Sequence, residues 1–88
     1  MVLRIADLTT DERALLLEVA LKRAPQLVLM LGQPTHVISE GDSSILTEAI
    51  GDELVATGMD QDWELSERGY VLERLLDRVN TVRIHRQG

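Results

Sequence analysis

The chain has 88 residues, room for one domain, and carries a net charge of −6 at pH 7. This charge repels nucleic-acid phosphates and anionic membranes, and the absence of cysteine excludes a disulfide framework and a thiolate metal site. Apolar residues make up 44% of the sequence and aromatic residues only 2%, so we expect an aliphatic core of the kind that packed helices form.

The sequence favours a protein that neither spans a membrane nor is secreted. Its longest unbroken apolar run is Leu27 to Leu31, far too short to cross a bilayer. Its first residues are followed by Asp7, Asp11 and Glu12 rather than by the apolar stretch of a secretory signal. We therefore predict a cytoplasmic location and no contact with a membrane.

The first half of the chain predicts two helices. Thr9 and Glu12 have the spacing of a capping box, in which each side chain bonds the backbone amide of the other residue, so a helix is expected over residues 10–23. Pro25 cannot continue that helix but suits the first turn of a new one. We interpret residues 25–31 as a short buried helix, with a strand as the alternative because so short an apolar run fits both.

The third predicted helix covers residues 44–57 and follows a loop. Apolar residues recur four apart from Leu46 onward, as on one face of a helix. Ser43 or Ser44 is positioned to cap the first turn. Gly51 weakens a helix interior by about 1 kcal/mol relative to alanine, and we expect it to mark the close approach of another backbone.

The fourth predicted helix covers residues 67–79, with Ser66 as its N-cap and Asn80 as its stop. Beyond it, residues 81–88 alternate between apolar and polar, so they are interpreted either as a strand beside the lead-in of residues 1–8 or as a frayed tail. The apolar stripe of this helix consists of Leu72, Leu75, Leu76 and Val79.

Together these elements predict an all-α or mainly α fold. We expect one small domain over residues 1–88 that packs three to four helices into a compact bundle. Short strands at the two ends of the chain are an alternative that the sequence does not exclude. A chain of this size buries roughly 60–65% of the surface that its unfolded form exposes, so only a modest stability is expected.

Residues 41–44, Gly-Asp-Ser-Ser, resemble the serine-bearing turn that opens the GDSL-type esterases. In that family a strand delivers the turn, and an Asp-x-x-His pair near the C-terminus completes the catalytic site. Here that pair is missing, because His85 follows Asp77 by eight residues, and the sheet of the family needs a longer chain. We interpret the four residues as a loop that leads into a helix, and we predict no catalytic residue and no enzymatic activity.

Asp60, Asp62 and Glu64 alternate as the ligands do in the first half of a calcium-binding loop. The second half of that pattern does not follow, since Leu65 stands where a glycine makes the turn and Val71 where a glutamate closes the coordination shell. A solvated acidic turn is therefore expected.

His36 and Glu40 are four residues apart, which is the spacing of a metal-binding pair on a helix. Pro34 and Gly41 on either side argue against a helix there, and no third ligand is identifiable. We predict no metal and no cofactor.

Residues 54–77 resemble the C-terminal part of winged-helix domains such as the MarR-like regulators. The likeness rests on E-L-V-A-T-G-M, a helix end with its glycine, and on E-L-S-E-R-G at residues 64–69, which opens the last helix of that fold. The resemblance implies that residues 44–57 form the recognition helix. That segment carries three carboxylates and no Lys or Arg, so direct DNA binding is not expected and a protein contact suits it better.

Trp63 and Tyr70 are the only Trp and Tyr of the chain, and they are candidate anchors for a protein partner. They favour a non-catalytic protein-interaction, accessory or regulatory module, whose partner the sequence does not identify. One alternative is a winged-helix-type regulator related to nucleic acid. Another is an acidic inhibitor that binds the basic nucleic-acid-binding surface of another protein, through one face that gathers Glu48, Asp52, Glu53, Asp60, Asp62 and Glu64.

The apolar residues between positions 15 and 31 exceed what one side of a helix can hold at about 100° per residue. So small a domain has few other elements to cover them, and an exposed apolar patch usually marks an interface. We therefore predict a homodimer, with a monomer whose end segments fold back over this surface as the alternative. The candidate self-association residues are Leu15, Leu16, Val19, Leu27 and Leu31.

Overall fold

The computed structural model describes residues 3–86 of the chain, and side chains from residue 3 to residue 82. This part of the chain contains four α-helices and two short 3-10 turns, and pairing of extended backbone is limited to two isolated antiparallel bridges. The expected all-α bundle is confirmed. The helices are α1 (Thr10–Arg23), α2 (Val28–Leu31), α3 (Glu40–Thr57) and α4 (Glu67–Arg86), and the 3-10 turns are Ile5–Asp7 and Pro25–Leu27.

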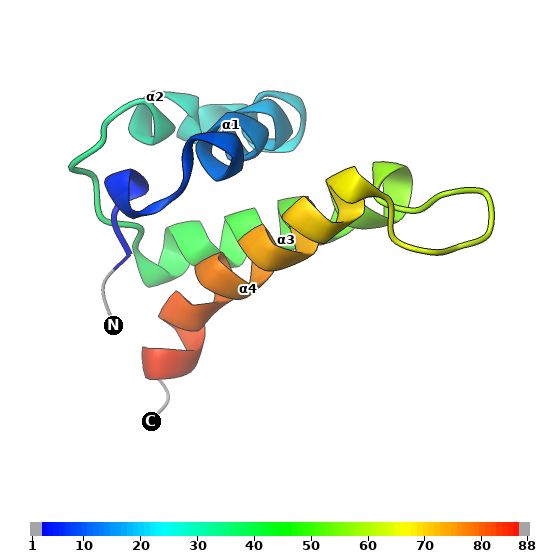
Figure 1. Ribbon diagram of the computed structural model, residues 1–88. Coiled ribbons are helices and arrows are strands. Elements are labelled where there is room, and N and C mark those ends of the chain that lie inside the picture. The colour runs from blue at the N-terminus through cyan, green and yellow to red at the C-terminus, as the bar shows by residue number, and fades with distance from the viewer. Residues whose placement is uncertain (1–2, 87–88) are drawn as a thin grey trace.

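The helices form two layers (Figure 1). α3 and α4 make a long antiparallel hairpin, and α1 with the short α2 lies across it. The hairpin is joined by hydrogen bonds near both ends. The Ser43 hydroxyl donates to the Val79 carbonyl over 2.7 Å, and the Ser66 amide donates to the Gly58 carbonyl over 2.9 Å.

Each long helix begins at a side-chain cap. The box of Thr9 and Glu12 forms as predicted, and the Ser66 hydroxyl accepts from the amide of Gly69 at the start of α4. The predicted start of α3 is wrong. Ser39 and Asp42 form a capping box of their own, which starts the helix at residue 40, so residues 41–44 belong to its first turns instead of to a loop.

The predicted end of α4 is also wrong, because the helix continues past Asn80 to Arg86. No glycine or proline interrupts residues 70–86, and Val82 extends the apolar stripe one turn beyond Val79 and is buried. The strand option for the tail is therefore excluded as far as residue 86, and the last two residues of that prediction lie outside the described part of the chain.

The lead-in packs against the loop before α3. Ile38 donates its amide to the Leu3 carbonyl over 2.9 Å, and Ile5 donates to the carbonyl of His36 over 3.0 Å. Residues 3–8 thereby lie over the core as an apolar strap, with Leu3, Ile5 and Leu8 buried. One of the two alternatives for the end segments is a strand pair between this strap and the C-terminal tail. Among the described residues no such pair forms.

The core is aliphatic, as the composition predicts, and every element contributes to it. Residues 28–31 are α-helical and residues 25–27 form a 3-10 turn, so the helix interpretation of this segment is confirmed in its second half. The fully buried side chains include Ile5, Leu16, Val19, Leu46, Ile50, Leu72, Leu75 and Val79.

A close approach of two backbones occurs where α3 meets α4, at Gly58 and Gly69. A Cβ added to Gly69 would overlap the carbonyl oxygen of Gly58, and one added to Gly58 would lie 3.2 Å from the Cα of Gly69. The close approach expected at Gly51 is wrong, because a Cβ there would meet nothing within 4 Å.

Candidate functional site

The serine of the esterase-like segment is a structural group in this fold. Ser43 is fully buried, and its hydroxyl donates to the carbonyl oxygen of Val79 over 2.7 Å. The hydroxyl thus links α3 to α4 in the interior of the hairpin, away from solvent.

The residues with metal-ligand spacing do not form a cluster of ligands. Within residues 3–82, no group of three or more such side chains is arranged to hold a metal ion. His36 lies 3.4 Å from Asp42, measured from Nε2 to Oδ2. Asp60 uses Oδ1 to accept the backbone amides of Asp62 and Glu64 over 2.8 and 3.1 Å, so this oxygen shapes the turn.

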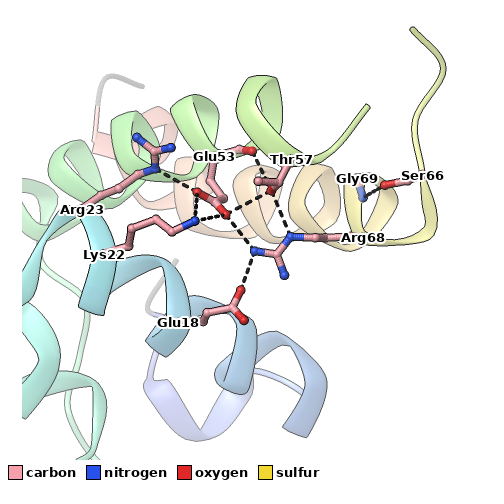
Figure 2. Close-up of polar contacts among 8 residues, drawn as sticks. All are labelled: Glu18, Lys22, Arg23, Glu53, Thr57, Ser66, Arg68 and Gly69. Carbon is pink, nitrogen blue, oxygen red and sulfur yellow. Dashed lines mark hydrogen bonds and ion pairs between the residues drawn. The ribbon is translucent and has the colours of Figure 1, made fainter. Parts of the chain in front are cut away.

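The most elaborate polar group is a network around Glu53, whose side chain is almost completely buried (Figure 2). Lys22 and Arg23, at the end of α1, bind this carboxylate over 3.1 and 3.0 Å. Arg68, in the first turn of α4, reaches it over 2.8 Å and also binds Glu18 of α1. The network therefore holds three helices together through one carboxylate.

The network keeps Glu53 ionised in spite of its burial. Burial raises the pKa of this carboxyl, but hydrogen bonds from Arg68, Lys22, Arg23 and Thr57 together lower the pKa to about 2. In turn, the bonds to Glu53 and Glu18 raise the pKa of Arg68. Removal of these donors would destabilise the bundle, because the carboxylate would be left as an unpaired buried charge.

A second buried glutamate anchors the other end of α1. Glu12 accepts a hydrogen bond from Arg78 over 3.2 Å, and Arg74 approaches its other oxygen to 3.7 Å. Arg78 also donates to the backbone carbonyl of Asp7 over 2.7 Å. Ion pairs thus hold α1 to α4 at both ends, so these charges belong to the architecture of the protein.

The turn between α3 and α4 carries the strongest candidate for a contact with another molecule. Trp63 is 80% exposed, and its φ of 62° is the only positive value at a non-glycine residue among those described. Its amide donates to the Asp60 carbonyl over 3.1 Å, and the turn is closed by a bridge between Met59 and Leu65. The tryptophan is therefore displayed to solvent on an ordered turn.

Tyr70, the other predicted anchor, is 64% exposed and lies one turn into α4. Since α4 begins at Glu67, both aromatic side chains belong to the same end of the α3–α4 hairpin. The structure thus keeps both predicted anchor residues accessible. Whether a partner contacts them stays a prediction.

Four of the five candidate self-association residues lie in the core of a single chain. Leu16, Val19, Leu27 and Leu31 are all buried, in one core cluster to which the strap of residues 3–8 and the α3–α4 hairpin also contribute. Leu15 is half-buried and lines a shallow hollow between α1 and α4, with Ala14 and Val71. An interface between two copies would have to use other side chains, and the homodimer itself stays a prediction.

The six acidic residues grouped for the inhibitor hypothesis do not all reach the surface. Glu53 is buried within its ion network. The exposed members lie on α3 and on the α3–α4 turn, and they are Glu48, Asp52, Asp60, Asp62 and Glu64.

Sequence reasoning missed the role of Glu53 and of the cations that bind it. One signal could have revealed it, because Glu53 follows Ile50 by three positions and Leu46 by seven, on the buried face of α3. A charged residue on such a face needs partners, and their identity depends on how α1 and α4 pack.

Neither a scan against protein-family models nor searches of curated proteins and of solved structures found a match to this chain. The winged-helix resemblance therefore stays a prediction. The helix that it assigns to recognition is α3, and the segment in the position of the wing is the short turn that carries Trp63. None of the described helices is long and apolar enough to span a bilayer.

Proposed function

We propose that this protein is a non-catalytic interaction module that contacts a protein partner through the α3–α4 turn, with Trp63 as the anchor. The supporting observation is the exposure of this side chain on a strained backbone. An L-residue in the left-handed region costs roughly 1–2 kcal/mol, and the indole gains little burial in return. Features of this kind are found at functional sites more often than elsewhere.

The turn is ordered before any partner binds. Asp60 bonds the amides of Asp62 and Glu64 through one carboxylate oxygen, and its own amide donates to the Glu64 carbonyl over 2.8 Å. A turn whose backbone is already fixed loses little backbone entropy on binding. Tryptophan is also among the residues that contribute most often to binding energy at interfaces.

The surroundings of Trp63 favour a basic surface on the partner. Asp60, Asp62 and Glu64 are exposed beside it, and the whole chain carries a charge of −6. Opposite charge on the partner would speed association, and this effect weakens as salt screens it. The same observation supports the second candidate function, an inhibitor that binds a basic nucleic-acid-binding surface of another protein. In this version the inhibitor makes its contact through the acidic turn and not through all six acidic residues.

The experiment is affinity capture from native cells with three forms of the protein: unaltered, Trp63→Gly and Val55→Ala. Glycine adopts the left-handed conformation without strain, so the first variant removes the indole and retains the turn. Val55 is an exposed apolar residue of α3 and serves as the control. We expect proteins that bind the unaltered chain and Val55→Ala to be lost with Trp63→Gly. Equal recovery with all three forms would contradict the proposal.

The second candidate is separated from the first by the nature of the captured protein. An inhibitor should compete with nucleic acid for its partner, so added DNA or RNA should displace it. A partner that binds nucleic acid and this protein at the same time would exclude the inhibitor and leave the general interaction module as the function. Raising the salt concentration should weaken the complex in either case, because the turn carries exposed carboxylates.

A further inference from the structure

α1 has an apolar face that the rest of the described chain covers only in part. Ala14, Leu17 and Leu21 follow each other at intervals of three and four residues, which places them on one face of the helix. Leu21 is 60% exposed, and Leu29 of the adjoining α2 is 86% exposed. The described side chains, residues 3–82, thus leave Leu21 and Leu29 open, and Leu17 between Ala14 and Leu21 is half-buried. α1 and α2 form one of the two layers of the molecule (Figure 1).

The shape of this face suits another helix. Ala14 has a small, exposed side chain. It lies between two shallow hollows, one shared with Leu15 and Val71 and the other with Leu17 and Leu31. A low ridge between two hollows allows the side chains of a facing helix to enter on both sides, as in ridges-into-grooves packing.

The charges beside this face indicate which helix fits. At about 100° per residue, Asp11, Glu18 and Lys22 lie along the same flank of α1, next to the apolar face. The acidic residue is in the first turn and the basic residue in the last turn. An antiparallel copy of α1 would therefore set Asp11 of each chain against Lys22 of the other, and the opposed helix dipoles would add to the attraction. A parallel copy would set this flank against the opposite flank of its partner and would align the two helix dipoles unfavourably.

Glu18 would come close to its counterpart near the centre of such a pair. Its carboxylate is already bound to Arg68 within the same chain, so the repulsion between the two copies is offset. Lys22 is also bound, to Glu53, but its side chain stays 54% exposed, and an ammonium group can donate to more than one carboxylate.

We propose that two copies of this chain form a homodimer by antiparallel packing of α1 on α1. Ala14, Leu17 and Leu21 lie at its centre and Leu29 at its edge. α1 has 14 residues and is about 21 Å long. A contact between two helices of this length buries less than the roughly 800 Å² per partner that standard interfaces bury. The dimer is consequently weak and dissociates on dilution. It uses neither Trp63 nor the other residues of the α3–α4 turn, so it is independent of the proposed function.

Cysteine cross-linking tests the arrangement, since the chain has no cysteine of its own. If Asp11 faces Lys22, the two-fold axis passes beside residue 17. A Leu17→Cys pair then lies at the axis, whereas a Thr10→Cys pair is about 20 Å apart along the helices. With a short bis-maleimide, we expect a covalent dimer for Leu17→Cys and none for Thr10→Cys. Equal cross-linking at both positions, or at neither above the level of a Val55→Cys control, would overturn the proposal.

Light scattering on a size-exclusion column gives a second, independent test. The unaltered protein should show a mass that rises from 9.9 kDa toward twice that value as its concentration increases. Leu21→Glu should raise the dissociation constant by about tenfold or more, because it forces an unpaired charge into the interface. Val55→Glu and Trp63→Gly should leave the dimer intact. A mass of 9.9 kDa for the unaltered chain at every concentration would end the dimer proposal, without bearing on the role of Trp63.

Discussion

Arg68 donates a hydrogen bond of 2.8 Å to the buried carboxylate of Glu53. The two residues stand at adjoining ends of α4 and α3, on either side of the Trp63 turn. Lys22 and Arg23 bring the end of α1 to the same carboxylate. The turn that displays Trp63 is therefore attached to the most tightly bonded region of the molecule. Its order can be attributed to this support as well as to its own hydrogen bonds.

Replacing Glu53 with glutamine should destabilise the fold by about 2–3 kcal/mol. The charge-assisted hydrogen bonds around it are lost, although Lys22, Arg23 and Arg68 can partly turn to solvent. Glu18→Gln is the matched control, since its carboxylate is exposed and binds only one of these cations; it should cost less than about 1 kcal/mol. Urea unfolding followed by circular dichroism measures both, and equal effects would contradict a special role for Glu53.

Acid should unfold the protein through the same carboxylate. The pKa of Glu53 is about 2 in the folded state, against an ordinary value of 4.5. A lowered pKa contributes stability that is complete above the ordinary value and disappears as pH falls toward the folded value. We therefore expect a loss on the order of 3 kcal/mol between pH 4.5 and pH 2. Glu53→Gln should flatten the pH dependence over this interval; an unchanged slope would show that other carboxyl groups cause it.

Alanine at two glycines of the hairpin should have opposite effects. Gly69→Ala should cost about 2–3 kcal/mol, because its methyl group would overlap the Gly58 carbonyl and push α4 away from α3. Gly51→Ala meets no neighbouring atom and should stabilise the helix by roughly 0.5–1 kcal/mol. Thermal unfolding measures the stability of both variants. If Gly69→Ala were as stable as the unaltered protein, the backbones of α3 and α4 would be able to separate at little cost in free energy.

The strain at Trp63 can be measured by two replacements at the same position. Both Trp63→Gly and Trp63→Ala remove the indole, but only alanine retains a side chain that disfavours positive φ. We expect the glycine variant to be more stable than the alanine variant by about 1 kcal/mol. Similar stabilities in denaturant titrations would mean that the residue leaves the left-handed region in solution.

The parts of the fold that could be predicted from the sequence are those fixed by neighbouring residues. The start of α1 depends on Thr9 and Glu12, and that of α4 on Ser66, all within one turn of the helix that they cap. The predicted start of α3 is wrong for a related reason. Gly41 suggested a loop, although the box of Ser39 and Asp42 is sufficient to begin the helix before it.

What could not be predicted depends on contacts between distant segments. Glu53 is interpreted from the sequence as one of several surface carboxylates, because the cations that bind it come from α1 and α4. The many apolar residues around Leu16 and Leu27 predict an interface because the sequence does not show where residues 3–8 lie. In the structure, Leu3, Ile5, Leu16 and Leu27 share one buried core, and the exposed large apolar residue of α1 is Leu21.

The position of Trp63 also determines how this protein can be observed. It is the only tryptophan of the chain, and it is already mostly in contact with water in the folded state. Its fluorescence should therefore emit at long wavelength in the native protein and change little on unfolding, so it is a poor reporter of stability. The same property makes it a sensitive reporter of association. A shift of its emission to shorter wavelength on addition of another molecule would indicate that the indole has been buried at a contact, without any label attached to the protein.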